Sequence, residues 1–424
     1  METVIEGKVL YKGNFIECCL GIDEGRIVSI KKILKGDKRI TYSGKVILPG
    51  AVDVHVHFRD PGLTHKEDFQ SGSISAAFGG VTCVFDMPNT IPPVISIDAA
   101  KEKLNIISKK AWVDFGIFGG CSSDADPQQI SDLVVGFKLY MSSVSGPLLV
   151  KDEQEIGDIL RAVIKTNKPL CIHAEDENLI AHGQASDLVD HECSRPIDAE
   201  VKAIKKIVSL YSGKGVHICH ISSSKDLEAL EGTKYSTEVT PHHLLLDNQC
   251  GHGAFAKVNP PLRTKAERTR LFSAFVNGRF DVLASDHAPH TIEEKNEDFS
   301  EAPCGMPSVE TSIPLMLALV KRDLVDIKVL MRSACEAPSE IFGIRKGRID
   351  IGFDADLMVV DFKKIDKIKA EMLHSKCGWT VYEGREAIFP YAVILRGMPI
   401  IEENSIIGER MGVNVAEPKH KSKR

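Results

Sequence analysis

The run Ile47-Leu48-Pro49-Gly50-Ala51-Val52-Asp53-Val54-His55-Val56-His57 determines how the remaining sequence is interpreted. It is an apolar segment of strand length that contains a Pro-Gly turn and ends in two histidines. Because side chains alternate between the two faces of a strand, His55 and His57 point to the same face. Two imidazoles on one apolar face are costly unless a polar group receives them.

Seven further apolar runs follow, and segments with helical spacing of apolar residues separate them. The runs cover residues 81–85, 113–118, 134–140, 169–173, 215–221, 235–240 and 280–285. The segments 152–165 and 198–211 are examples of the helical spacing. Strand–helix alternation repeated eight times predicts an α/β fold, a (β/α)8 TIM barrel over residues 47–342.

Both ends of the chain are instead rich in short strands and turns. Residues 4–10 and 21–30 are typical of short strands with glycine-bearing turns, and residues 352–361 form a turn that leads into an apolar strand. We therefore expect residues 1–46 and residues 343–424 to assemble together into a small β-sandwich domain beside the barrel.

Length and composition are those of an ordinary globular protein. The 424 residues suit one barrel of roughly 250 residues or more with a smaller accessory domain. Hydrophobic residues make up 43% of the chain and charged residues 26%, and the net charge of −6 argues against a nucleic-acid partner. The basic tail at residues 419–424 is interpreted as a solvated terminus.

The sequence also predicts the compartment. The 11 cysteines are an odd number without a regular framework, which favours reduced thiols in the cytoplasm. The N-terminus lacks the basic and apolar regions of a signal peptide, and no run approaches the roughly 18 apolar residues of a membrane helix. We expect a cytoplasmic protein with no membrane partner.

Metal-binding side chains stand at the ends of five of the predicted strands, where barrel enzymes keep their chemistry. They are His55, His57, Lys138, His173, His220 and Asp286. Imidazoles and a carboxylate in such a set predict a metal centre, with ligand types typical of zinc. For Lys138, either the buried ammonium pairs with a carboxylate, or the neutral amine reacts with carbon dioxide to become an anionic carbamate that bridges two metals.

These residues resemble the cyclic amidohydrolases of the amidohydrolase superfamily, and the resemblance covers nearly the whole chain. Within that group the pattern is most similar to the dihydroorotases of the class I type. The segments that carry the resemblance are HVHFRDPG at 55–62, DMPNT at 86–90, VNPPLR at 258–263 and SDHAPH at 285–290. Each segment alone is a weak signal, and together they are a strong one.

The resemblance implies two divalent metal ions, zinc being expected first and manganese or cobalt being alternatives. His55, His57 and Asp286 would hold one ion, His173 and His220 the other, and N6-carboxylated Lys138 would bridge them. A hydroxide shared by the metals would be the nucleophile, with Asp286 as general base and then general acid. The implied reaction is the reversible cyclisation of N-carbamoyl-L-aspartate to (S)-dihydroorotate in de novo pyrimidine (UMP) biosynthesis.

The implied substrate carries a free carboxylate, which needs cationic and hydrogen-bonding partners. Arg59 supplies a planar pair of donors for it, and a hydantoinase acting on neutral rings has no comparable need. The residues expected to contact substrate are His57, Arg59, Asn89, Asn259, His290, Cys304 and Gly305. Arg59, Asn89 and His290 would bind the carboxylate, and Asn259 with the backbone of Cys304 and Gly305 would meet the ring.

Several alternatives stay open. A hydantoinase, dihydropyrimidinase or allantoinase would share the metal centre, and a non-catalytic scaffold would have lost metal ligands. Cys219 and Glu238 resemble a third zinc site of some relatives, although Cys219 is otherwise an inert buried thiol. A homodimer is expected from relatives, and association with aspartate carbamoyltransferase, known for some relatives, has no support in the sequence.

Overall fold

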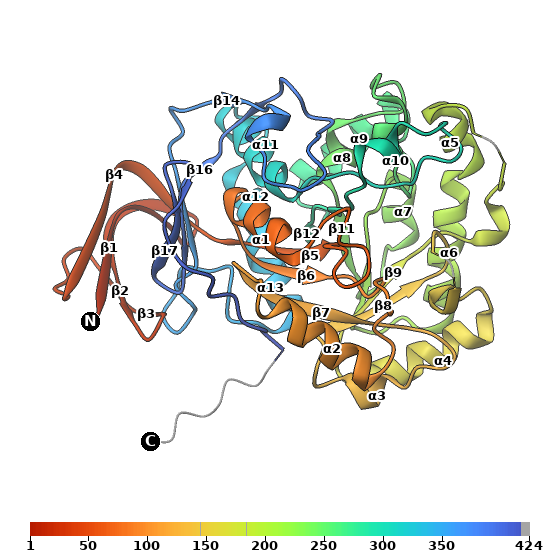
Figure 1. The fold of residues 1–424 in the computed structure, drawn as a ribbon, viewed down its shortest axis with the longest axis horizontal. Coiled ribbons are helices and arrows are strands. Elements are labelled where there is room, and N and C mark those ends of the chain that lie inside the picture. Colours follow the sequence, from red (N-terminus) through yellow and green to blue (C-terminus); the bar gives the residue numbers. More distant parts are fainter. Residues whose placement is uncertain (145, 184, 417–424) are drawn as a thin grey trace.

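A closed barrel of eight parallel strands forms the centre of the molecule (Figure 1). The computed structural model describes residues 1–144, 146–183 and 185–416, so the basic tail at residues 419–424 lies outside the described residues. In sheet order the strands are β5 (Ala51–Val56), β6 (Val81–Asp86), β7 (Asp114–Gly120), β8 (Gly136–Tyr140), β9 (Leu170–His173), β10 (Val216–Ile218), β11 (Ser236–Val239) and β12 (Val282–Leu283). The ring closes where the backbone N–H of His57 donates to the carbonyl of His287 across 2.8 Å. The predicted (β/α)8 fold is confirmed.

Helices connect the strands and cover the outside of the barrel (Figure 1). They are α1 (Phe69–Phe78), α2 (Ile97–Ile107), α3 (Pro127–Ile130), α4 (Glu153–Ile164), α5 (Leu188–Ser194), α6 (Ile197–Leu210), α7 (Ser224–Ala229), α8 (Pro241–Leu245), α9 (Lys265–Val276), α10 (Ile292–Lys295), α11 (Val309–Lys321), α12 (Ile327–Met331) and α13 (Ala337–Phe342). In α4 the side chain of Asp152 accepts from the backbone N–H of Glu155 and starts the helix. Ile156, Leu160 and Val163 then recur at helical spacing and are buried, so this face packs on the barrel.

Strands from both ends of the chain share a second sheet beside the barrel (Figure 1). Its order is β18 (Ser405–Ile406), β17 (Met398–Glu402), β16 (Pro390–Leu395), β13 (Leu357–Val360), β4 (Lys38–Pro49), β1 (Thr3–Tyr11), β2 (Asn14–Asp23) and β3 (Arg26–Lys31). Strands of the two ends contribute to one apolar core that includes Ile5, Leu20, Leu357 and Ile394. The predicted union of the two ends in a small β domain is confirmed, while division points at 46/47 and 342/343 stay predictions.

Strand β4 links the two sheets directly. It pairs in parallel with β1 and antiparallel with β13, and after Gly50 the chain continues as β5 of the barrel. A Cβ atom at Gly50 would lie 2.3 Å from Oγ1 of Thr82, so only glycine allows this close approach. The Pro-Gly turn noted in the sequence is therefore the junction between the small sheet and the barrel.

A buried ion cluster also joins the two parts. Nζ of Lys346 lies 2.5 Å from a carboxylate oxygen of Asp114, at the start of β7, and 2.5 Å from one of Asp356, just before β13. Asp354 lies 3.2 Å from the same ammonium, and Arg396 pairs with Asp114. These fully paired charges fix the small sheet against the amino-terminal end of the barrel.

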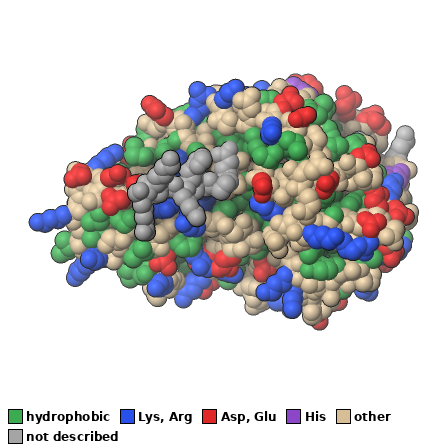
Figure 2. All heavy atoms as spheres, turned by 90° about the horizontal axis from the view of Figure 1, so that it is seen from below, with side chains coloured by type: hydrophobic (Ala, Val, Ile, Leu, Met, Phe, Trp, Pro, Cys, Tyr) green, Lys and Arg blue, Asp and Glu red, His purple; other side chains and the backbone are tan. Residues whose placement is uncertain are grey.

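Charges of both signs are mixed on the molecular surface. On the face drawn in Figure 2, lysine and arginine side chains are interspersed with carboxylates and with apolar side chains. A nucleic-acid surface would instead concentrate basic residues. Within the described residues, no helix is both long and apolar enough to cross a membrane.

Candidate metal centre and active site

The carboxyl ends of the barrel strands meet at a cavity of about 100 Å³. All six predicted metal ligands line this cavity: His55, His57, Lys138, His173, His220 and Asp286. The barrel brings together strand ends that are up to 231 residues apart in the chain, as His55 and Asp286 are. This is the end of the barrel at which enzymes of this architecture place their active sites.

The first ligand group consists of His55, His57 and Asp286. Oδ1 of Asp286 lies 3.5 Å from Nε2 of His55 and 3.3 Å from Nε2 of His57. Nδ1 of His55 donates to Oε1 of Glu238 at 2.7 Å, and Nδ1 of His57 donates to Oδ1 of Asn89 at 2.8 Å. Because the Nδ1 atoms are used in this way, the Nε2 atoms are the ones available to a metal ion.

The second ligand group is the pair His173 and His220. Nδ1 of His173 lies 2.9 Å from Nε2 of His220, so the two rings direct nitrogen atoms at one point. Nε2 of His173 donates to Oε2 of Glu175 at 2.7 Å, and Arg195 binds the same carboxylate at 3.0 and 2.6 Å. Although burial opposes it, Arg195 and His173 hold the pKa of Glu175 well below its usual range, so this carboxylate stays ionised.

Protonation within the first group shows that it accommodates a cation. Burial lowers the pKa of His57 to about 4, which keeps it neutral as a metal ligand must be. Burial and Lys138 also oppose charge on His55, but the carboxylates of Glu238 and Asp286 raise its pKa to about 10. The cluster therefore attracts one positive charge at neutral pH. A divalent ion would supply that charge and release the proton, so the donor set fits a metal ion.

Lys138 stands between the two groups, on β8. Its side chain is fully buried, and Nζ lies 2.9 Å from Sγ of Cys219. Among the described residues no carboxylate lies within ion-pair distance of this ammonium. The carboxylate partner considered from the sequence is therefore not observed, and the carbamate interpretation stays a prediction.

The backbone is unusual at four non-glycine residues of the cavity. Arg59, Ser143, His220 and Asp286 have positive φ angles of 61°, 64°, 35° and 46°, a region that residues with a Cβ atom rarely adopt. Such conformations persist only where the surroundings enforce them, and they concentrate at functional sites. The fold thus holds a binding residue candidate and two ligand candidates in directions that an ordinary loop would not give.

The predicted substrate-binding residues fall into two groups. Arg59, Asn89, Asn259, Cys304 and Gly305 line the cavity, as His57 does. The guanidinium of Arg59 donates to the carbonyl of Pro289 at 3.2 Å and lies 3.1 Å from Nε2 of His290. His290 is buried and is not among the residues that line the cavity, but its Nε2 also lies 3.1 Å from the carbonyl oxygen of Cys304, at the cavity wall.

Another part of the cavity wall is built from the backbone at Gly305. Gly305 has a φ of 135°, and a Cβ atom there would lie 2.4 Å from the carbonyl oxygen of Ala288. A side chain at this position would collide with the cavity wall, which explains why glycine occupies it. Asn259 accepts from Nε2 of His191 at 3.0 Å, which fixes its amide at the rim.

Sequence reasoning missed several residues of this site. Glu175 and Arg195 orient His173, and Tyr140 lines the cavity. Glu175 stands two residues after His173, and that spacing was a signal that could have found it. Arg195 follows no such pattern, because a loop after α5 brings it to the site.

Glu238 was predicted only as part of a third metal site with Cys219. His55, Cys219 and Glu238 do place ligand atoms within 4.8 Å of one another. Glu238 already accepts from His55 and, at 3.1 Å, from Nε2 of His217. The contacts described give Glu238 an orienting role, and the third metal stays a prediction.

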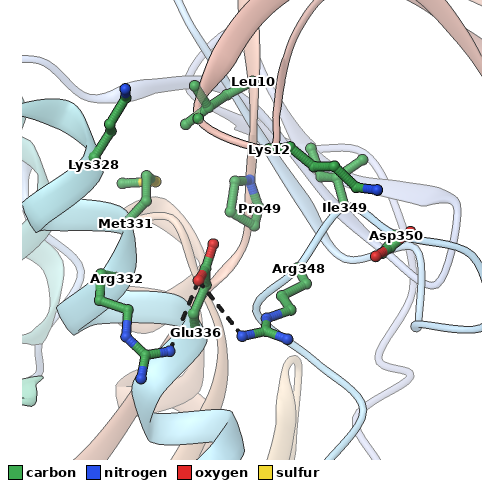
Figure 3. A pocket seen from close by; sticks show the side chains of 11 residues that line it. Leu10, Lys12, Pro49, Lys328, Met331, Arg332, Glu336, Arg348, Ile349 and Asp350 are labelled. Atoms are coloured by element: carbon green, nitrogen blue, oxygen red, sulfur yellow. Dashed lines mark ion pairs between the residues drawn. The ribbon is translucent and has the colours of Figure 1, made fainter.

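A larger cavity of about 530 Å³ lies elsewhere, between the small sheet and the helices after α11 (Figure 3). Pro49, the last residue of β4, forms part of its wall and precedes the amino-terminal end of β5, so this cavity is remote from the strand ends that carry the ligands. In Figure 3 Glu336 lies between Arg332 and Arg348, at 3.8 and 3.6 Å. Both of these arginines are thus paired with a carboxylate, and none of the predicted metal ligands lines this larger cavity.

Comparison with known proteins agrees with this geometry. The profile of the amidohydrolase family matches residues 46–386. The chain is 40% identical to the dihydroorotase of Thermoplasma acidophilum over 420 residues, which cover 99% of both chains. It is 38% identical to the dihydroorotase of Thermoplasma volcanium over 417 residues, or 97% of both chains. Among solved structures, the L-hydantoinase (dihydropyrimidinase) from Arthrobacter aurescens is similar, with a TM-score of 0.92 and 28% identity over 97% of this chain and 98% of that one. The chain therefore belongs to the amidohydrolase family and, within it, to the dihydroorotases.

Proposed function

We propose that this enzyme interconverts N-carbamoyl-L-aspartate and (S)-dihydroorotate, the ring-closing step of de novo pyrimidine synthesis. The observation that carries the proposal is the position of Arg59, whose guanidinium lines the same cavity as the six ligand candidates. Nε of this buried arginine is held by the carbonyl of Pro289, which leaves donors on its two terminal nitrogens for a carboxylate. Both relatives named above are dihydroorotases.

We further propose that the cofactor is a pair of zinc ions. His55, His57 and Asp286 would hold one, His173 and His220 the other, and Lys138, carboxylated at N6, would bridge them. When bound, the ions would polarise the amide carbonyl and provide a hydroxide nucleophile at neutral pH.

Asp286 is the group proposed to move the proton. Although burial opposes it, His55 and His57 hold the pKa of Asp286 well below its usual range, so its carboxylate is ionised and able to accept. In ring opening it would take the proton of the nucleophile on a carboxylate oxygen and then give it to the leaving ring nitrogen. Ring closure runs through the same positions in reverse.

The remaining residues bind and orient the substrate. Arg59 would grip the carboxylate, and the amide N–H₂ of Asn89 would add a donor, since its oxygen is occupied by His57. Asn259 and the backbone at Cys304 and Gly305 would meet the ring. His290, whose Nε2 lies 3.1 Å from the guanidinium of Arg59, would complete the site for the carboxylate.

Hydantoin hydrolysis is a second candidate, because the similar solved structure named above is a hydantoinase.

The test assays purified wild type and Lys138→Ala for ring closure of N-carbamoyl-L-aspartate, with hydantoin and allantoin as rival substrates. We expect the wild type to close N-carbamoyl-L-aspartate and to contain about two metal ions per chain, and the variant to lose both properties. Lys151→Ala, at an exposed lysine, is the matched control.

Two other outcomes of this experiment would assign the chain a different function. Turnover of hydantoin or allantoin alone, by metal-loaded wild type, would assign the chain to a related ring hydrolase. A folded protein that binds no metal would be a scaffold. The cytoplasmic location, the homodimer and the association with aspartate carbamoyltransferase stay predictions.

A further inference from the structure

Tyr140 reaches the active-site cavity from the end of β8. It is two residues after Lys138 on the same strand, so both side chains point into the barrel, with Tyr140 nearer the mouth. The strand register pairs Tyr140 with His173 on β9. Its ring centroid lies 5.2 Å from Nζ of Lys138 and 6.4 Å from the ring of His173, and the residue lines the cavity.

The hydroxyl group of Tyr140 is polar, buried and unsatisfied. Only 5% of the residue is exposed, and among the described residues Oη has no hydrogen-bond partner. A buried donor without an acceptor is costly, and in a binding cavity a bound ligand can supply the missing acceptor. Tyr42 and Tyr382 share this feature, but neither of them lines the cavity.

The position of Arg59 indicates which group of the substrate accepts a hydrogen bond from the phenol of Tyr140. Tyr140 and Arg59 line the same cavity of about 100 Å³. A carboxylate has about four lone-pair positions, of which the two donors of an arginine fork occupy two. A carboxylate held by Arg59 would therefore have acceptor positions left for another donor.

We propose that Tyr140 is a specificity-determining residue whose phenol O–H donates a hydrogen bond to the substrate carboxylate held by Arg59. This inference rests on the proposed function. It explains discrimination against rings with an apolar substituent, because such a substituent would leave the phenol buried without an acceptor. It also separates this site from one for neutral rings, in which the hydroxyl group would have no use.

The test compares wild type, Tyr140→Phe and the control Tyr42→Phe, which removes an equally buried hydroxyl from the small sheet. The measurements are kcat and KM for dihydroorotate, metal content, and calorimetric dissociation constants for two probes. Orotate carries the carboxylate on a planar ring, and dihydrouracil lacks it. In Tyr140→Phe we expect KM and the dissociation constant of orotate to rise about tenfold or more, the magnitude of a hydrogen bond to a charged group. Values of kcat, metal content and dihydrouracil binding should stay at the level of the control.

Each other result overturns the inference. A fall in kcat at unchanged KM would assign the phenol to the chemical step, and equal losses of orotate and dihydrouracil binding would assign it to packing. Loss of metal would show that it supports Lys138. If wild type turns over dihydroorotate and Tyr140→Phe is unaffected, only the inference fails. If wild type has no such activity, the proposed function fails and this inference with it.

Discussion

Two of the metal-facing imidazoles are held in place by a carboxylate on the other ring nitrogen. Glu238 accepts from His55, and Glu175 accepts from His173, each at 2.7 Å. Such partners fix the tautomer and raise the basicity of the ligand. His220 differs, because among the described residues its Nδ1 has no hydrogen-bond partner. The second ligand pair therefore depends on Glu175 for its orientation.

We predict that Glu175→Gln weakens metal binding at His173 and His220 about 10- to 100-fold, because an amide cannot hold the imidazole as firmly as an ionised carboxylate. Metal titration of the chelator-stripped enzyme measures the change. Glu177→Gln removes a nearby carboxylate that pairs with Lys151 and His182 outside the cavity and serves as control. Equal affinities of the two variants would contradict an orienting role.

Single site residues can be predicted from the sequence where they stand at the end of a recognisable strand. His55, His57, Lys138 and His173 could be predicted because each lies at or near the end of an apolar run that the barrel directs to one place. The role of Arg195 could not, since it depends on how a loop folds back across 20 residues to Glu175. No periodic pattern encodes such a distance.

Among the elements, the segment after α10 supplies the cavity wall and is tied down by two buried lysines. Nζ of Lys257 donates to the carbonyl oxygens of Phe299 at 2.6 Å and Ala302 at 2.8 Å. Nζ of Lys295 donates to those of Pro303 at 2.8 Å and Gly305 at 3.0 Å. These contacts hold the backbone that the substrate ring is proposed to meet.

Replacing Lys257 by methionine should loosen this segment by on the order of 2 kcal/mol, because charge-assisted hydrogen bonds are lost while the aliphatic stem is kept. Hydrogen–deuterium exchange of residues 296–306 should accelerate, and KM should rise. Lys265→Met, at an exposed lysine of α9, should change neither quantity. Unaltered exchange in Lys257→Met would show that the segment is held by packing instead.

For the molecule as a whole, the ion cluster around Lys346 is expected to be a main determinant of stability. Lys346→Met would leave the carboxylates of Asp114 and Asp356 buried with less positive charge, at a cost of about 3–5 kcal/mol. Denaturant unfolding would detect the loss as a lower transition midpoint. Lys364→Met, at an exposed lysine, is the control. A midpoint equal to that of wild type would mean that the small sheet and barrel are joined mainly by apolar contacts.

The architecture was predictable and this cluster was not. Repeated strand–helix alternation and β-rich ends indicate a barrel with a small β domain whatever the detailed contacts are. Lys346 and Asp114 lie 232 residues apart, and only the completed fold brings them together. Ion pairs of this kind leave no local trace in a sequence.

The central place of β4 in the small sheet bears on how the chain is made. During translation β4 leaves the ribosome early, whereas β13, which covers its other edge, follows only after residues 50–356. Until β13 is made, this edge has bare backbone donors and acceptors. A chain that stops before Leu357 keeps the edge open, and such truncated products are expected to pair with other chains or to be retained by chaperones.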